Sequence, residues 1–462
     1  MNLPPSQKPN LIGGHFRKFR KDATGFLTAQ SKLGDVSFFR MGSQPGYFLN
    51  HPDFIRDLFV VNAHKFMKGR ALQRAKNLLG EGLLTSEGAA HLRQRRMIQP
   101  AFHRARIAEY AESMVEFADK MSNAWSDGEV LDIDKEMMHL TLQIVGKTLF
   151  SANVEDDADD VGNAMTTVSK LFDFLLLPYS EWLQKLPLPQ TGRFNRARAT
   201  LNSVIYGIIE RRRASGEDTG DLLSMLLAAR DEEDGRSMTD VQIRDEALTL
   251  FLAGHETTSN ALTFTWYLLS QNPDKANKLH DELDRVLTVE ESLPDAGNPQ
   301  SEIRNPKLGR LPTIDDLPNL KYTEAVLAES MRLFPPAWAI GRLALEDHEF
   351  GGYTIPKGSL ILVSPYIAHR DSRYWDDADQ FIPERWESQG VKEAGQKNIY
   401  FPFGGGIRRC IGEGFAWTEG ILLLATLARK WKLSLMPEQK IGLMPLITLR
   451  PKYGMRMRAE KR

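Results

Sequence analysis

The chain has 462 residues, 42% of them hydrophobic, and a formal net charge of −1 at pH 7. This balance gives no support to nucleic-acid binding, which needs a basic stripe or excess. A single cysteine, Cys410, excludes an intramolecular disulfide framework and any metal site built from several cysteines. The amino terminus lacks an apolar signal core, and no apolar run is long enough to span a bilayer, so we expect a cytoplasmic protein without a membrane anchor.

The N-terminal part of the chain predicts a small sheet followed by helices. Residues 34–50 alternate apolar and polar side chains around Gln44-Pro-Gly, which predicts a β-hairpin with its turn at that tripeptide. A helix is expected over 52–61. Residues 68–87 mix glycines with leucines and predict irregular structure over a cavity or surface.

His91 and Arg95 stand four residues apart, so they share one face of a predicted helix. Spacing alone favours an exposed basic helix. Several helices are expected over 107–213, broken by prolines at 178, 187 and 189. The apolar segment 171–188 is either core or a lid over a substrate.

The longest predicted helix begins at a capping box with Thr239 as its N-cap and ends before Pro273. Residues 247–253 are apolar all round, so the middle of this helix is buried. Glu256 and Thr257 follow at once, and such polar groups are costly in a buried helix unless they have partners or a task. A zinc-protease helix is excluded because position 259 is serine where a second histidine is required. A structural glutamate with satisfied hydrogen bonds stays the alternative.

Beyond this helix the chain predicts further helices and short strands. A helix is expected over 273–287, whereas 290–311 is polar, rich in Pro, Gly and Asn, and reads as a surface insertion. The next helix, 322–333, carries Glu329-x-x-Arg332, which by itself is an ordinary helical ion pair. Residues 349–365 predict a hairpin pair that extends the first sheet.

The stretch from Phe401 to Gly412 holds the single cysteine. Its glycines, 404–406, allow backbone angles closed to other residues and a close approach to a bulky partner. A helix expected over 411–431 puts Cys410 just ahead of a helix N-terminus, where free N–H groups favour a thiolate. A thiolate held by glycine-rich backbone indicates the axial ligand of a haem iron. A cysteine that is only a small buried hydrophobe is the alternative.

This stretch resembles the haem-binding loop of the cytochromes P450, the haem-thiolate monooxygenases. The pattern F-x-x-G-x-R-x-C-x-G is filled by Phe403, Gly406, Arg408, Cys410 and Gly412. The other family motifs follow in the same order, as A-G-x-E-T-T at 253–258, E-x-x-R at 329–332 and F-x-P-E-R-W at 381–386. The resemblance implies a mainly α fold with small β-sheets and a long central helix across the haem. It implies one domain over residues 1–462, with a small sheet mainly from 34–50 and 349–365.

The resemblance also implies roles for particular residues. Cys410 would ligate the iron of haem b, with Phe403 packed beside its sulfur and Gly406 and Gly412 in the same loop. Glu256 and Thr257 would organise the water that delivers protons to dioxygen. The expected donors to the haem propionates are His91, Arg95, Arg342 and Arg408. The expected structural cluster is Glu329, Arg332 and Arg385.

We therefore predict a monomeric monooxygenase that activates dioxygen and oxidises a lipophilic small molecule, such as a fatty acid, terpenoid or steroid. The chain has no nucleotide-binding glycine loop and no fused reductase, so electrons would come from a separate ferredoxin- or flavodoxin-type partner. The basic segment 91–106, with Arg409, is expected on the cysteine side as a docking face; a merely solvated face is the alternative. The expected pocket lining is apolar: Leu83, Leu84, Phe172, Phe174, Leu250, Ala253, 338–340 and 444–447.

Three rival functions are open at this stage. A peroxygenase would use hydrogen peroxide and could dispense with the acid–threonine pair that this chain retains. A non-catalytic haem electron carrier or sensor would need neither an apolar pocket nor a proton relay. A cysteine hydrolase would need a base near Cys410, and no local nucleophile signature surrounds that residue.

Overall fold

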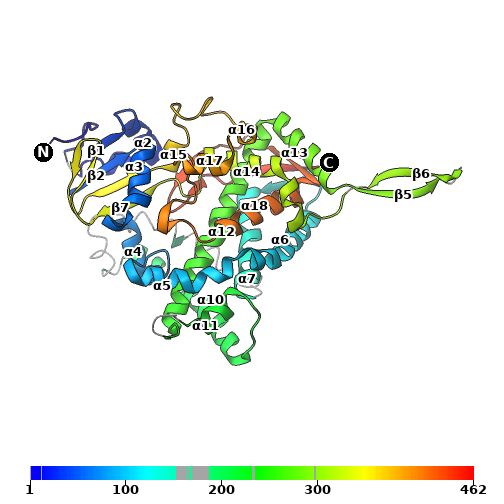
Figure 1. The fold of residues 1–462 in the computed structure, drawn as a ribbon, viewed down its shortest axis with the longest axis horizontal. Coiled ribbons are helices and arrows are strands. Elements are labelled where there is room, and N and C mark those ends of the chain that lie inside the picture. Colours follow the sequence, from blue (N-terminus) through cyan, green and yellow to red (C-terminus); the bar gives the residue numbers. More distant parts are fainter. Residues whose placement is uncertain are drawn as a thin grey trace.

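The computed structural model describes residues 2–11, 13–151, 164, 167–168, 186, 188–230, 235–295, 298–307 and 309–462. The body is mainly helical, with a small sheet at the end where the N-terminus lies (Figure 1). The expected fold class is confirmed. The described helices are α1 Phe16–Lys21, α2 Ala23–Ser31, α3 Pro52–Arg56, α4 Arg70–Leu79, α5 Gly88–Ile98, α6 Arg104–Ala124, α7 Ile133–Phe150, α10 Pro189–Ser215, α11 Leu222–Ala228, α12 Asp240–Gln271, α13 Pro273–Leu287, α14 Lys321–Leu333, α15 Pro365–Ala368, α16 Arg385–Gln389, α17 Val391–Gln396 and α18 Glu413–Ala428.

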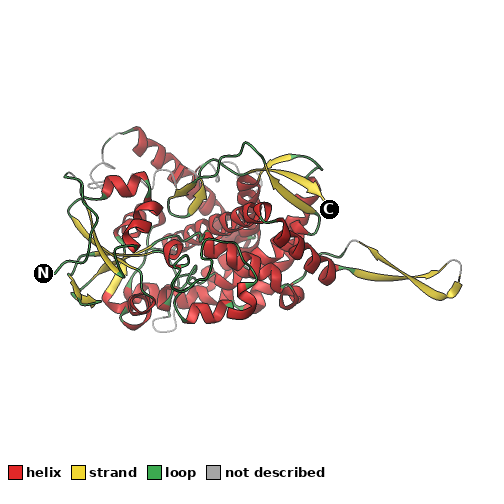
Figure 2. Ribbon diagram, turned by 90° about the horizontal axis from the view of Figure 1, so that it is seen from above, coloured by secondary structure: helices red, strands yellow, loops and turns green. Residues whose placement is uncertain are grey.

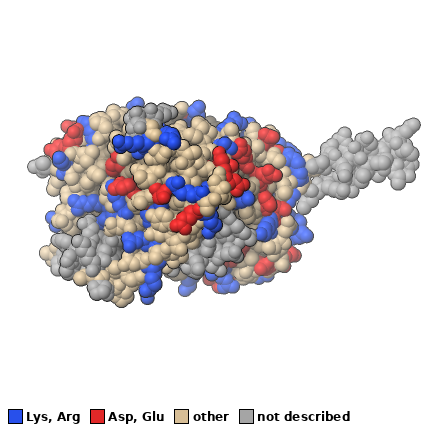
Figure 3. Space-filling view, turned by 90° about the horizontal axis from the view of Figure 1, so that it is seen from below, with Lys and Arg blue, Asp and Glu red and all other residues tan. Residues whose placement is uncertain are grey.

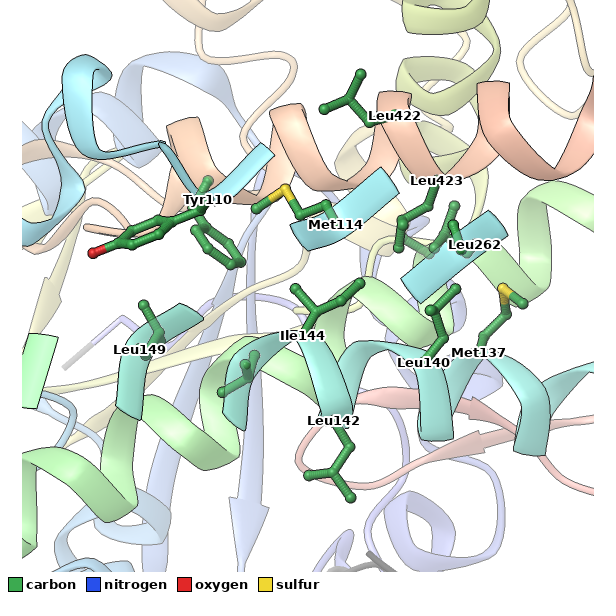
Figure 4. Close-up of a cluster of buried hydrophobic side chains, with 14 of the residues drawn as sticks. Tyr110, Met114, Met137, Leu140, Leu142, Ile144, Leu149, Leu262, Leu422 and Leu423 are labelled. Atoms are coloured by element: carbon green, nitrogen blue, oxygen red, sulfur yellow. The ribbon is translucent and has the colours of Figure 1, made fainter. Parts of the chain in front are cut away.

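The long helix α12 lies at the centre of the helical body. Its predicted capping box is present, because the Thr239 hydroxyl accepts from the backbone N–H of Gln242 and the Gln242 side chain accepts in return from Thr239 N–H. Helices α7 and α18 pack against it, and α6 packs against α7 and α18. Figure 4 shows their apolar side chains converging, among them Met114 from α6, Leu140 from α7 and Leu423 from α18. The helix is buried through its middle, as its composition predicts.

The main sheet has five strands in the order β1-β2-β10-β7-β3. The described strands are β1 Val36–Met41, β2 Gln44–Leu49, β3 Phe66–Lys68, β4 Val130–Asp132, β5 Val289–Asp295, β6 Asn298–Lys307, β7 Ile340–Ala344, β8 His348–Phe350, β9 Tyr353–Ile355, β10 Leu360–Val363, β11 Trp431–Leu435, β12 Leu443–Pro445, β13 Leu449–Pro451 and β14 Arg456–Lys461.

The sheet prediction was correct in part. The hairpin β1–β2 forms, but its turn lies at Gly42, and Gln44-Pro-Gly begins β2 instead. The reason is packing: a Cβ at Gly46 would lie 2.3 Å from the Phe39 ring, so the glycine admits that ring in mid-sheet. Of the strands expected within 349–365, only β10 joins the sheet, parallel to β2, whereas β8 and β9 pair with each other. The contributions of β3 and β7 were not predicted.

Residues 68–87 are not irregular throughout, because they contain α4. Ala75, Leu78 and Leu79 are buried, at the spacing of one helical face. Gly80 ends the helix with φ +63°, a conformation that favours glycine. The glycines therefore mark the ends of a helix instead of an irregular segment. Likewise Pro189 begins α10 where a break was expected, at the first helical position that tolerates proline.

The prediction of a surface insertion near residues 290–311 agrees with a long hairpin, β5–β6, that projects from the body beyond α13 (Figures 1 and 2). Lysine and arginine are interspersed with acidic residues on the face shown in Figure 3, without a continuous basic stripe there. Among the described helices, none is long and apolar enough to cross a membrane.

A buried charge cluster joins α14 to the segment that leads to the cysteine loop. Glu329 accepts from Arg332 Nε and Nη2, both at 2.9 Å, and from Arg385 Nε at 3.0 Å. The backbone N–H of Ile382 and the indole N–H of Trp386 also donate to it, each at 3.0 Å. The three residues of the expected structural cluster are therefore in contact, and they fix the chain between α14 and α16.

Candidate active site

A cavity of about 1440 Å³ brings together residues that lie far apart in the sequence. Its lining comes from α12, from the loop before α18, from β7 and from the segment 443–448. Typical small-molecule pockets have roughly 300–1,000 Å³. The cavity therefore has room for a large cofactor and a substrate together.

Cys410 lines this cavity at the end of the 401–412 loop, with an accessible side chain. The Cys410 N–H donates to the Phe403 carbonyl at 3.0 Å, which closes the loop on itself. Gly404 and Gly406 have φ of +70° and +63°, a conformation that favours glycine, whereas Gly405 is extended. A Cβ at Gly406 would lie 1.7 Å from the Phe59 carbonyl oxygen.

The loop glycines therefore differ in their tasks. Gly406 does not line the cavity, and its close approach is to the chain at Phe59 instead of to a cofactor. Gly412 does line the cavity and is the N-cap of α18. Phe403 also lines the cavity, and its ring lies 5.9 Å from that of Trp417.

The expected thiolate is not favoured by the protein alone. The protein atoms around the Cys410 sulfur displace water from one side of it and so raise the pKa of the thiol, and the Gly412 N–H lowers that pKa only in part. Helix α18 begins at Glu413 and ends at Ala428, so Cys410 lies three residues before it instead of beside its first turn. A metal ion that binds the sulfur would deprotonate it outright.

Five basic residues gather at the cavity wall. His91 and Arg95 from α5, Arg342 from β7 and Arg408 from the cysteine loop all line it. The fifth, Lys68 at the end of β3, was missed by the sequence reasoning; its ammonium donates to the carbonyls of Leu83, at 2.8 Å, and Leu84. All four expected donors are thus brought together, with one carboxylate, Glu87, which pairs with Arg408.

These basic groups destabilise one another's charge. Burial first, and then the neighbouring cations, lower the pKa of His91 to about 3 and that of Lys68 to about 7. Burial and Arg408 lower the pKa of Arg342 to about 10. A cluster of this kind is stabilised when an anion lies against it.

Glu256 and Thr257 lie on the cavity side of α12, and both line the cavity. The Thr257 hydroxyl donates to the Ala253 carbonyl at 2.8 Å, within the continuous helix. Glu256 is buried and accepts from the Thr448 hydroxyl at 2.5 Å, with Arg450 Nη1 at 4.0 Å from the same oxygen. Thr448 and Arg450 come from the C-terminal part of the chain, and no sequence signal marked them.

Most of the expected pocket lining is present. Leu83, Leu84, Leu250, Ala253, 338–340 and 444–447 all line the cavity. Phe172 and Phe174 lie outside the described residues. The lining is predominantly apolar, which suits a lipophilic ligand.

The residues of this site fit a haem. The Cys410 sulfur is accessible in the cavity, the cations at its wall match two propionate groups, and the volume exceeds that of a substrate alone. Cys410 would hold the group at its iron, and His91, Arg95, Arg342, Arg408 and Lys68 would hold its propionates. A mainly helical fold around such a cavity is the arrangement of a haem-thiolate oxygenase.

Comparison with known proteins identifies the family. The family model described as Cytochrome P450 matches residues 4–455. Cyclooctatin synthase from Streptomyces melanosporofaciens is 38% identical over 441 residues, which cover 95% of this chain and 91% of that protein. Cyclooctat-9-en-7-ol 5-monooxygenase from the same organism is 35% identical over 435 residues, 94% of this chain and 89% of the relative. Pentalenene oxygenase from Streptomyces avermitilis is 33% identical over 454 residues, which cover 98% of this chain and 96% of that protein.

The chain belongs to the cytochrome P450 family and is a haem-thiolate monooxygenase. Its reaction requires dioxygen, a lipophilic substrate and a redox partner. The recognition of the family from the cysteine loop and the order of the motifs is confirmed.

Proposed function

We propose that this chain oxidises a terpenoid-like hydrocarbon or alcohol, with haem b held by Cys410 and the cations at the cavity wall. The observation that carries the proposal is the cavity itself, which Cys410, the acid–threonine pair and a mainly apolar set of side chains all line. The haem, when bound, supplies the activation of dioxygen and the transfer of oxygen. The chain supplies binding, orientation and protons.

The substrate class rests on two observations. The lining is apolar on several sides, from Leu83 and Leu250 to Trp338 and Leu446, and it leaves space for a rigid polycyclic skeleton. Three relatives similar along almost their whole length are named for cyclooctatin, cyclooctat-9-en-7-ol and pentalenene. Among the fatty acid, terpenoid and steroid classes, these names favour the terpenoid.

The proton supply rests on Glu256 and Thr257. Glu256 is held by the Thr448 hydroxyl, which also accepts from Asn260 Nδ2 at 3.2 Å, and this fixes the carboxylate beside the cavity. The Thr257 hydroxyl, one residue on, can turn from the Ala253 carbonyl to a water in the cavity. Together they would hold a proton and pass it into the cavity.

The redox partner is proposed to be an acidic ferredoxin or flavodoxin. Arg95 Nη1 donates to the Arg409 carbonyl at 2.8 Å, so the basic helix α5 lies directly against the cysteine loop. Arg96 and Arg104 are exposed, whereas the charge of Arg409 is paired with Glu413. The docking face would therefore rely on α5 and the start of α6 more than on Arg409.

The test is spectroscopic first and chemical second. The reduced, carbon-monoxide-bound protein should give the thiolate absorption band, and Cys410→Ser should lose it while remaining folded. Reconstitution with a ferredoxin system should then convert a terpene such as pentalenene to a product that carries one added oxygen. A Cys410→Ser protein with the wild-type spectrum would remove Cys410 from the site. Oxidation of a fatty acid but no terpene would overturn the substrate class alone.

A further inference from the structure

The segment between α4 and α5, residues 80–87, crosses the edge of the cavity and is called the strap here. It places Leu83 and Leu84 in the cavity lining. Separate parts of the molecule hold its backbone, among them helix α12, Lys68 of β3 and Arg408 of the cysteine loop. The strap is not a regular helix or strand, so its position depends on these contacts.

On one side, two buried acidic side chains of α12 accept hydrogen bonds from the backbone N–H groups of the strap. Asp245 Oδ2 accepts from the backbone N–H of Glu81 at 2.8 Å, and Glu246 Oε2 accepts from the N–H of Leu83 at 2.8 Å. Neither carboxylate lines the cavity, and the relative exposures of the two residues are 5% and 0%. They lie behind the strap, on the same helix as the acid–threonine pair.

On the other side, cations of the cavity wall donate hydrogen bonds to the carbonyls of the strap. Lys68 Nζ donates to Leu83 O at 2.8 Å and also to Leu84 O. Arg408 Nη1 donates to Ser86 O at 2.9 Å and its guanidinium pairs with Glu87. The peptide units around Leu83 are thus fixed at the N–H by Glu246 and at the carbonyl by Lys68.

Glu246 is the least expected of these groups. It is fully buried, its Oε1 has no hydrogen-bond partner among the described residues, and it takes no part in the proton supply proposed above. Burial raises the pKa of its carboxyl to about 8, while the Leu83 N–H and Lys68 act in the opposite direction. An ionisable group is costly at such a place, and its one hydrogen bond among the described residues is to the strap.

We infer that Glu246 is a positioning residue that fixes the strap through the Leu83 N–H and thereby sets where Leu83 and Leu84 meet the ligand. Lys68 acts with it from the opposite side. The consequence for ligand selection rests on the proposed function, whereas the fixing of the strap does not. Loss of Glu246 should loosen one side of the cavity and relax its selectivity without touching Cys410 or Thr257.

Amide hydrogen exchange of the haem-loaded protein tests the first step. Glu246→Leu removes the acceptor, and exchange at the Leu83 amide should accelerate by roughly 3- to 10-fold, as for a lost hydrogen bond between uncharged groups. Glu246→Gln keeps a side-chain oxygen and should stay close to the wild-type rate. Glu282→Gln is the matched control, because Glu282 is also buried and accepts the backbone N–H groups of Tyr322 and Thr323. It should leave strap exchange unchanged.

Two ligands of the iron test the second step. Imidazole is small, whereas 4-phenylimidazole extends further into the apolar lining, and their dissociation constants can be read from the shift of the haem absorption band. Glu246→Leu should weaken 4-phenylimidazole by about 3- to 10-fold, the cost of part of one leucine's apolar contact. Imidazole should bind as before, and Glu246→Gln should restore the wild-type ratio.

Several outcomes would overturn the inference. A Leu83 amide that exchanges at the unprotected rate in the wild type refutes the strap contact, and this measurement needs no variant. Equal weakening of both azoles would indicate general damage instead of positioning. A protein without a thiolate spectrum but with a protected strap would instead refute the proposed function alone.

Discussion

Replacing Glu329 by glutamine should be among the most damaging single substitutions outside the cavity. The carboxylate is fully buried and receives five hydrogen bonds, from Arg332 (two), Arg385, Ile382 and Trp386. Glutamine has nearly the same shape as glutamate, so the substitution keeps the side-chain volume and removes the negative charge. Arg332, itself fully buried, would lose its countercharge.

The magnitude follows from the donors. Oε1 receives three of the hydrogen bonds and Oε2 receives two, so either orientation of a glutamine amide sets its NH2 group against at least two donors. Each lost hydrogen bond to a charged group costs about 1.5–3 kcal/mol. Removing one partner of a buried ion pair likewise costs about 3–5 kcal/mol, a large part of the ~5–15 kcal/mol that stabilises a typical protein.

Urea unfolding followed by tryptophan fluorescence measures this loss without depending on activity. The matched control is Glu393→Gln, which removes an exposed ion pair to Lys397 at 2.7 Å and should change the free energy of unfolding by less than about 1 kcal/mol. An unfolding midpoint for Glu329→Gln within error of the wild type and of Glu393→Gln would refute the reasoning. The cluster would then contribute little to the stability of the fold.

Three further predictions concern the proton supply, the cations of the cavity wall and the redox partner. Thr257→Ala should consume reducing equivalents but release hydrogen peroxide in place of product, and an unchanged ratio of product to electrons would exclude its role in proton supply. The pKa of His91 is lowered to about 3 from an ordinary 6.5, so between these pH values the unfolded chain binds a proton that the folded chain does not. The haem-free protein should therefore lose stability as the pH falls from 6.5 toward 3. His91→Gln should reduce this dependence of the free energy of unfolding on pH, measured by unfolding at several pH values. Reversing Arg93, Arg96 and Arg104 to glutamate should slow the first electron transfer from an acidic ferredoxin and remove the salt dependence of its rate. Stopped-flow rates that change neither with salt concentration nor with the charge reversal would place the docking face elsewhere.

Several features of this protein could be predicted because their signals are local. The capping box at Thr239 and the apolar run after it define α12 from neighbouring residues alone. The spacing around Cys410 is equally local, and it led to the haem and to the family. The glycines at 404 and 406 are required by positive φ angles, which a short stretch of sequence can indicate.

Other features were decided only by contacts between distant segments. Lys68 reads as an ordinary surface lysine in the sequence. Its burial could not be predicted, because its partners are the backbone carbonyls of Leu83 and Leu84, which carry no side-chain signature. Thr448 reaches Glu256 from 192 positions later in the chain, and Glu246 reaches Leu83 across 163 positions. Sequence periodicity reports which face of an element is buried but not which segment covers it, so the strap and the fifth cation required the tertiary structure.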